Sequence, residues 1–213
     1  MVKVNKKILT IIAIVLMLIS ITSSIYAATD QAGVFGTPGI GQLGGSSTAS
    51  MVETIMRTRL GYSVTAYSDS VTSKSTVTSY INQSANNYAF SLTAKRNSSN
   101  GNPIIGSSTL AKSEISGNWH LVILNFPYSA VDQSWANAFK TVGYTNRAFM
   151  GWYSSYDEVD VNSWTYNFMI QLNFYGAGGY PTLRDAALEA ADYVSGSTPI
   201  RMYGDKTWNG LAW

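Results

Sequence analysis

The single histidine and two nearby serines are the first residues whose types suggest catalysis. His120 is the only imidazole in the sequence, and Ser129 and Ser134 follow it. A serine nucleophile needs an imidazole within hydrogen-bond reach to take its proton. The apolar run 121–124 is typical of a strand, and at about 3.3 Å per residue it separates His120 from Ser129 by roughly 20 Å. We therefore expect no serine–histidine pair and interpret His120 as the opening residue of a core strand.

Carboxylates are the second set of residues that could carry a reaction. Asp157 and Asp160 lie close together in the sequence, and Asp205 follows a glycine. Two carboxylates suffice for glycoside hydrolysis, but nothing in this spacing selects that role. Aspartate at a helix start or beside glycine usually caps the helix or stabilises a turn. We interpret all three as capping and turn residues.

Composition removes several other kinds of chemistry. The chain has no cysteine, so it has no thiol nucleophile and no disulfide, and with one histidine it lacks the usual ligands of zinc. The glycine-rich stretch 33–50 matches neither GxGxxG nor GxxxxGK[ST], so it predicts a loop after a short apolar piece rather than a phosphate site. We expect no metal and no cofactor.

The first 27 residues have the features of an export signal. Lys3, Lys6 and Lys7 precede an apolar run of about 14 residues, shorter than the roughly 20 that span a bilayer, and Ala27 ends a small-residue cleavage region. Cleavage would remove three of the 14 basic residues and leave 11 against 12 acidic ones. We expect a secreted, extracellular protein with no stable membrane anchor and no affinity for nucleic acid.

Apolar spacing in the rest of the chain predicts alternating helices and strands. The expected helices cover 50–60, 74–87, 135–142, 157–174 and 182–194, and the expected strands cover 62–67, 88–94, 119–124, 147–152 and 199–203. This alternation is typical of an α/β fold, here a three-layer α/β/α sandwich with a mostly parallel central sheet. The continuous apolar run 119–124 predicts the central strand, and the polar stretch 95–118 predicts a long excursion with a short strand at 104–105. The predicted organisation is a flexible segment at 28–50 and one domain at 51–213.

Several stretches match, in order, the pattern of one known fold. Residues 60–64 (LGYSV) look like a helix end and a second strand, and residues 121–130 (LVILNFPYSA) are similar to the strand and turn that carry a cysteine nucleophile. Residues 183–191, followed by 199–205 (PIRMYGD), resemble a closing helix and a last strand that ends in Gly-Asp. On these segments the chain resembles the caspase-like cysteine peptidases, the clan of caspases, gingipains and legumains.

The resemblance implies a histidine after the strand that precedes the excursion and a cysteine after the next strand. In this chain the first position falls at Lys95 or Arg96, depending on a one-residue shift, and the second falls at Pro127. Proline has no nucleophile, and a cationic side chain is a poor base at neutral pH. We therefore expect the inherited peptidase reaction to be absent.

The former cleft of such a fold lies beyond the carboxyl ends of its parallel strands. The residues expected there are Lys95, Arg96, Asn125, Phe126, Tyr128, Trp152 and Tyr153. Exposed aromatic side chains at this edge would suit a peptide or a sugar, whereas Phe126 and Trp152 could instead pack in the core.

The expected function is that of a secreted, catalytically inactive caspase-like homologue that binds a peptide or protein partner. Two alternatives stay open at this point. One is a hydrolase with a rebuilt site of Ser, Asp or Tyr, and the other is a module that uses the aromatic residues, 13% of the chain, to bind a cell wall or another cell-surface polysaccharide.

Overall fold

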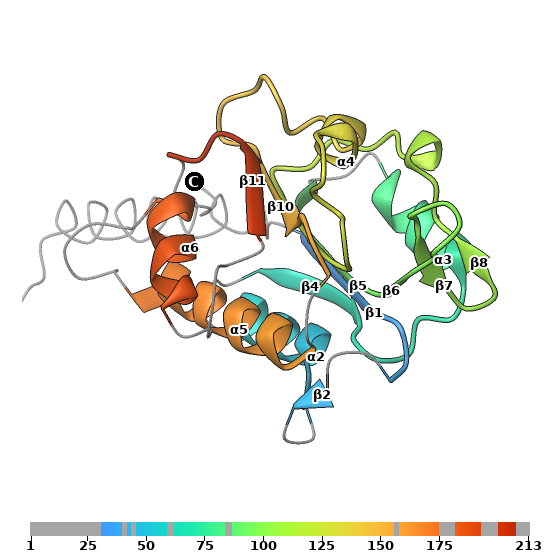
Figure 1. Cartoon of the computed structure of the whole chain (residues 1–213), viewed down its shortest axis with the longest axis horizontal. Helices are drawn as coiled ribbons and strands as arrows, with labels where there is room; N and C mark the ends of the chain where they lie inside the picture. The colour runs from blue at the N-terminus through green and yellow to red at the C-terminus, as the bar shows by residue number, and fades with distance from the viewer. Residues whose placement is uncertain are drawn as a thin grey trace, which may run out of the picture.

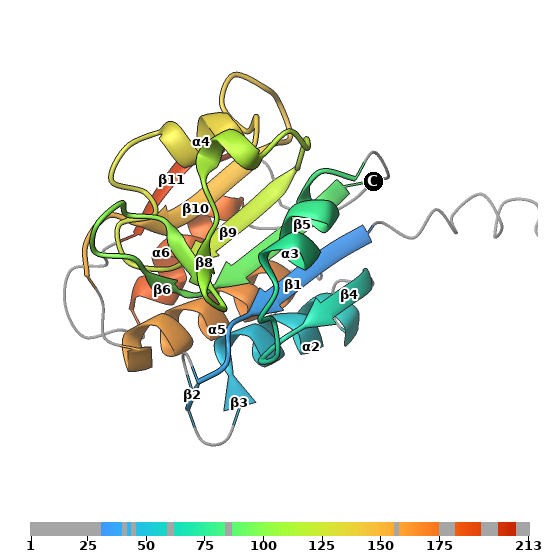
Figure 2. The same cartoon turned by 90° about the vertical axis from the view of Figure 1, so that its right-hand side faces the viewer.

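The computed structural model describes most of the chain (Figures 1 and 2). The described residues are 31–39, 42–43, 46–58, 62–83, 87–155, 158–174, 182–192 and 200–207. The predicted export signal and Asp157 lie outside them. No helix in these ranges is both long and apolar enough to cross a membrane.

A six-stranded sheet forms the centre of the molecule. In spatial order its strands are β4 (Ser63–Tyr67), β1 (Gln31–Gly36), β5 (Asn87–Thr93), β9 (Leu121–Asn125), β10 (Ala148–Trp152) and β11 (Ile200–Gly204). All neighbouring pairs are parallel except β10 and β11, which are antiparallel. The prediction of an α/β fold with a mostly parallel sheet is therefore confirmed. The run predicted as the central strand forms β9, which lies in the sheet interior.

Helices pack against both faces of this sheet (Figure 2). Helices α2 (Thr48–Thr58), α5 (Glu158–Phe174) and α6 (Leu183–Ala191) share one hydrophobic core with one set of strand side chains. Helices α3 (Lys74–Ile81) and α4 (Ser134–Ala138) share a second core with the alternate set. Side chains of a strand alternate between faces, so strands such as β9, all of whose residues are buried, read as continuous apolar runs.

Strand β1 corrects the prediction of a loop at 33–50. Residues 31–36 lie between β4 and β5, with Val34 buried in one core and Phe35 in the other. Helix α2 also begins inside the predicted loop, at Thr48. The strand was missed because it contains two glycines, which are rare in strands. Gly36 is needed for close packing, since a methyl group there would lie 1.9 Å from the carbonyl oxygen of Ser68.

The predicted excursion at 95–118 folds back against α3. It contains a small antiparallel sheet of β6 (Lys95–Arg96), β7 (Pro103–Ile105) and β8 (Ser108–Thr109), followed by the short helix η1 (Lys112–Glu114). The short strand expected at 104–105 is therefore confirmed, as part of β7. Lys74 of α3 pairs with Glu114 at 2.7 Å, and this hydrogen bond, with one from the Ala111 amide, holds the pKa of Glu114 below its usual range. A second two-stranded sheet joins β2 (Gln42–Leu43) and β3 (Ser46–Ser47).

The packing around β1 generates a stability prediction. Gly36→Ala should destabilise the protein by about 1–3 kcal/mol, because the added methyl group meets backbone that cannot move without shifting the strand. Urea unfolding followed by circular dichroism would measure the change. Ser63→Ala on the exposed side of β4 is the control and should leave the midpoint nearly unchanged. An unchanged midpoint for Gly36→Ala would contradict the packing of β1.

Candidate functional site

The two positions expected to replace a catalytic dyad follow neighbouring strands. Thr93 at the end of β5 pairs with Asn125 at the end of β9, and the Ala94 amide donates a hydrogen bond to the Asn125 carbonyl oxygen at 3.2 Å. Lys95 comes directly after this contact on one chain, and Pro127 comes two residues after it on the other. The structure therefore brings both positions to the carboxyl edge of the sheet.

Arg96 and Tyr128 form a contact between the two segments. The Arg96 guanidinium carbon lies 4.9 Å from the centroid of the Tyr128 ring, a cation–π distance. The Nε atom of Arg96 is buried and has no hydrogen-bond partner among the described residues. Tyr128 has a φ of 60°, which is uncommon for a bulky residue and is found most often at functional sites. The Tyr128 side chain is 38% exposed, so this strained residue faces solvent.

Ser129 holds the turn after β9 onto the neighbouring strand β10. Its hydroxyl donates to the carbonyl oxygen of Leu124 at 2.8 Å and accepts from the amide of Trp152 at 2.9 Å. The side chain is buried, with 1% of its area exposed. Since a backbone carbonyl already receives its proton, this hydroxyl lacks the base that a nucleophile requires.

A buried polar cluster lies beneath the edge. The Asn125 side chain donates to the Thr93 hydroxyl at 3.5 Å and accepts from the indole N–H of Trp152 at 3.3 Å and from the Thr165 hydroxyl at 3.4 Å. These residues and Phe126 are almost fully buried. Phe126 and Trp152 therefore pack in the core, the alternative left open for them, and Asn125, which was expected to line the cleft, is buried as well. Buried amide and indole groups need hydrogen-bond partners, which this cluster provides.

A second arginine–tyrosine pair lies at the end of β10. The Arg201 guanidinium carbon is 4.8 Å from the Tyr153 ring centroid, and the same side chain donates to the Val131 carbonyl oxygen at 3.2 Å. Tyr153 was expected at this edge from the sequence, whereas Arg201 was not. Arg201 belongs to the antiparallel strand β11, and only the pairing of Gly151 with Arg201 brings it here.

His120 lies at the opposite edge of the sheet from Ser129. Its Nδ1 atom is 2.9 Å from the carbonyl oxygen of Asn146, and its ring stacks on Tyr88 with centroids 5.1 Å apart. The expectation that the histidine and Ser129 do not meet is confirmed. Ser134 opens α4, and its amide donates to Asp132 at 2.8 Å.

The structure describes two of the three aspartates that were expected to have structural roles, Asp160 and Asp205. Asp205 accepts hydrogen bonds from the Asn146 amide and from the amide and hydroxyl of Thr207, as expected for a turn residue. Asp160 lies within α5. Among the described residues, no group of three His, Asp or Glu side chains is arranged to hold a metal ion.

The bridging role of Ser129 generates a second stability prediction. Ser129→Ala should lower the free energy of unfolding by about 1–3 kcal/mol, because it leaves the Trp152 amide buried without its acceptor. Guanidinium unfolding monitored by tryptophan fluorescence would measure it. Ser155→Ala, at an exposed position shortly after β10, is the matched control. Equal stability of the two variants would show that the hydroxyl is not structural.

Comparison with family models and with curated proteins gives no match. The resemblance to caspase-like peptidases therefore stays a prediction from residues 60–64, 121–130, 183–191 and 199–205.

Proposed function

We propose that the protein is a secreted, catalytically inactive caspase-like peptidase homologue that binds a peptide or protein segment rich in carboxylates. The binding surface is the carboxyl edge of the sheet around Pro127. The observation that carries the proposal is the set of exposed and half-buried cationic and aromatic side chains at this edge, combined with a serine that is buried and already hydrogen-bonded.

The arrangement of strands and helices supports the family part of the proposal. Helices on both faces of a mostly parallel sheet agree with a three-layer caspase-like architecture. The two dyad positions of that family require neighbouring strands, and β5 and β9 are neighbours. Lys95, Arg96 and Pro127 occupy those positions in this chain, so the proposed homologue lacks both the base and the nucleophile.

The hydrogen bonds of Ser129 count against a rebuilt serine hydrolase. Its oxygen is inaccessible to a substrate carbonyl, and its proton is directed at the Leu124 carbonyl oxygen. The chain's imidazole lies at the other edge of the sheet, where it contacts Asn146. Binding without turnover therefore fits the geometry better than hydrolysis.

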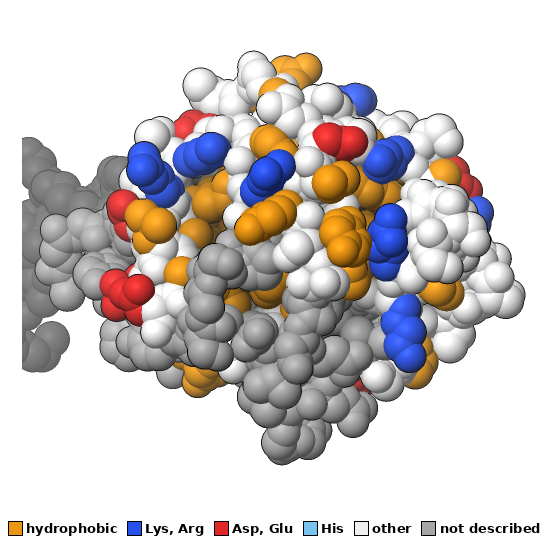
Figure 3. All heavy atoms as spheres, viewed as in Figure 1, with side chains coloured by type: hydrophobic (Ala, Val, Ile, Leu, Met, Phe, Trp, Pro, Cys, Tyr) orange, Lys and Arg blue, Asp and Glu red, His pale blue; other side chains and the backbone are white. Residues whose placement is uncertain are grey.

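The charge of the edge indicates the chemistry of the partner. None of Lys95, Arg96 and Arg201 forms an ion pair within the described ranges. Each arginine lies over a tyrosine ring, which holds its planar guanidinium in place while leaving N–H groups to bind. Figure 3 shows Lys and Arg side chains next to hydrophobic ones over β6 and β11. Guanidinium groups bind carboxylates through paired hydrogen bonds, so a partner with Asp or Glu side chains is favoured.

Binding of a labelled, glutamate-rich peptide tests the proposal. Fluorescence anisotropy should detect binding that weakens as salt is raised, because exposed charges are screened. A peptide with Gln at every Glu position should bind much more weakly. The double substitution Arg96→Ala with Arg201→Ala should reduce affinity by about tenfold or more, since two charge-assisted contacts are lost.

The control variant removes a similar pair elsewhere. Arg147 lies 4.5 Å from the Tyr144 ring centroid, just before β10 begins and so at the other edge of the sheet. Arg147→Ala should leave peptide binding unchanged. The proposal fails if both peptides bind equally, if the two arginine variants behave alike, or if the protein cleaves peptides with a turnover that is lost in Ser129→Ala.

A further inference from the structure

A pocket lies between α6 and β11, away from the two arginine–tyrosine pairs. Its volume is about 480 Å³, within the range of roughly 300–1,000 Å³ that is typical of small-molecule sites. The lining residues are Trp164, Arg184, Ala187, Leu188, Ala191, Ile200, Met202 and Lys206. They come from three elements and the turn after β11, so the tertiary structure builds the pocket.

The regular geometry of both elements explains the lining. Positions 184, 187, 188 and 191 follow one another at helical spacing, so they form one stripe of α6. Side chains alternate between the two faces of a strand. Ile200 and Met202 of β11 therefore face the pocket, whereas Arg201 between them points to the opposite face of the sheet, where it contacts Tyr153. Leu188 is 59% exposed, a large value for an apolar side chain beside a cavity.

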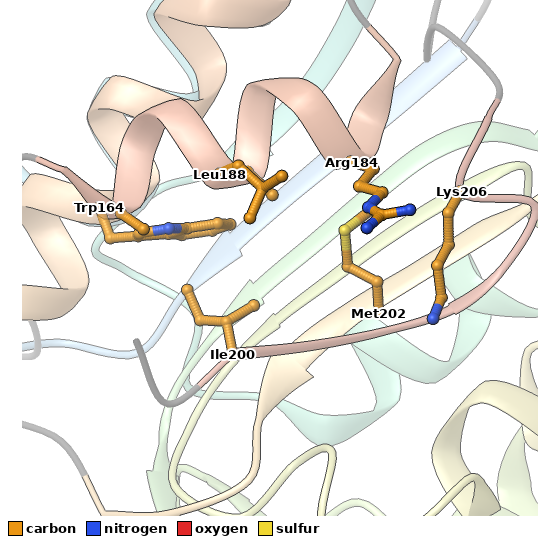
Figure 4. A pocket seen from close by; sticks show the side chains of 8 residues that line it. Trp164, Arg184, Leu188, Ile200, Met202 and Lys206 are labelled. Atoms are coloured by element: carbon orange, nitrogen blue, oxygen red, sulfur yellow. The ribbon is translucent and has the colours of Figure 1, made fainter. Parts of the chain in front are cut away.

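The pocket has a cationic end and an apolar end. In Figure 4 the side chains of Arg184, Met202 and Lys206 lie at one end of the pocket, with the Lys206 ammonium directed away from the Arg184 guanidinium, whereas Trp164 lies at the opposite end beyond Leu188 and Ile200. A hydrogen bond of 3.2 Å from the Arg184 amide to the Lys206 carbonyl oxygen holds the two cationic residues at this end. Neither side chain has a carboxylate partner among the described residues. Two cationic side chains at one end of the pocket, neither with a counter-charge, favour an anionic ligand.

The apolar end of the pocket is lined by hydrocarbon groups. The indole nitrogen of Trp164 is itself buried and inaccessible, so any part of the side chain that borders the cavity is apolar. Leu188 and Ile200 form the rest of this end and provide no polar atom, and Met202, which lies beside the two cations, adds only the weakly accepting sulfur of methionine. A ligand tail that fills this space would therefore be hydrocarbon.

We propose that this pocket binds an amphiphilic monocarboxylate of medium chain length. Its carboxylate contacts Arg184 and Lys206, and its hydrocarbon tail lies over Met202 and Leu188 toward Trp164. The site is separate from the edge around Pro127, and the proposal does not rest on the proposed function.

Calorimetric titration of the purified protein with decanoate, below its micelle-forming concentration, tests the proposal. Decanoate should bind at one site, and decanol, which has a tail of the same length and no charge, should bind at least about tenfold more weakly. Hexanoate should also bind at least about tenfold more weakly, because four fewer methylene groups are buried.

Substitutions locate the site. Arg184→Ala with Lys206→Ala should weaken decanoate binding by about tenfold or more, and Leu188→Ser should weaken it severalfold. All three residues are exposed, so the fold should be retained, which circular dichroism would check. Lys140→Ala and Val131→Ser remove an exposed cation and an exposed apolar side chain elsewhere, and should have no effect on decanoate binding. The proposal is overturned if decanoate does not bind, if decanol binds equally well, or if the double variant and Leu188→Ser bind decanoate as the controls do.

Discussion

Burial of both faces of one sheet is the constraint on which the rest of this structure depends. The chain has no cysteine, so no disulfide assists the hydrophobic core. Two cores, one on each face, must therefore supply the stability, and β9 and β10 between them have no exposed residue. The glycines of β1 serve the same end, because Gly36 lets α2 and the turn after β4 approach the strand closely and Gly33 makes room for the Tyr80 ring of α3.

At the carboxyl edge of the sheet, the burial of both faces decides which polar groups remain available to bind a ligand. Asn125, Ser129 and Thr93 lie at the carboxyl edge but below the surface, so each must find a hydrogen-bond partner within the protein. The Asn125 side chain bonds to Thr93, and the Ser129 hydroxyl bonds to β9 and to β10. These hydrogen bonds join β5, β9 and β10 at their ends. The groups left for a ligand are those that keep some exposure at this edge, namely Lys95, Tyr128 and the two arginines. This division is the reason why we propose a binding surface there and not a reaction centre.

Strand β11 contributes to both proposed ligand sites because its side chains alternate. Arg201 points toward Tyr153 and the loop after β9, while its neighbours Ile200 and Met202 line the pocket under α6. The two sites differ in what they can hold. The edge presents cations beside tyrosine rings on an open surface, whereas the pocket has cationic side chains at one end and apolar side chains at the other (Figure 4).

The sequence by itself determined the class of fold and most of its elements. Apolar periodicity is a local signal, so the helices and the runs such as 121–124 were predictable, and the absence of cysteine removed thiol chemistry. Strand β1 was not predictable, because glycine is rare in strands and its role here, close packing against neighbouring elements, does not show in the sequence. Only the tertiary structure decided that Asn125 and Trp152 are buried, that Arg201 joins the edge, and that Arg184 and Lys206 share a pocket. Each of these depends on contacts between residues far apart in the sequence, and such contacts leave no periodic pattern in the chain.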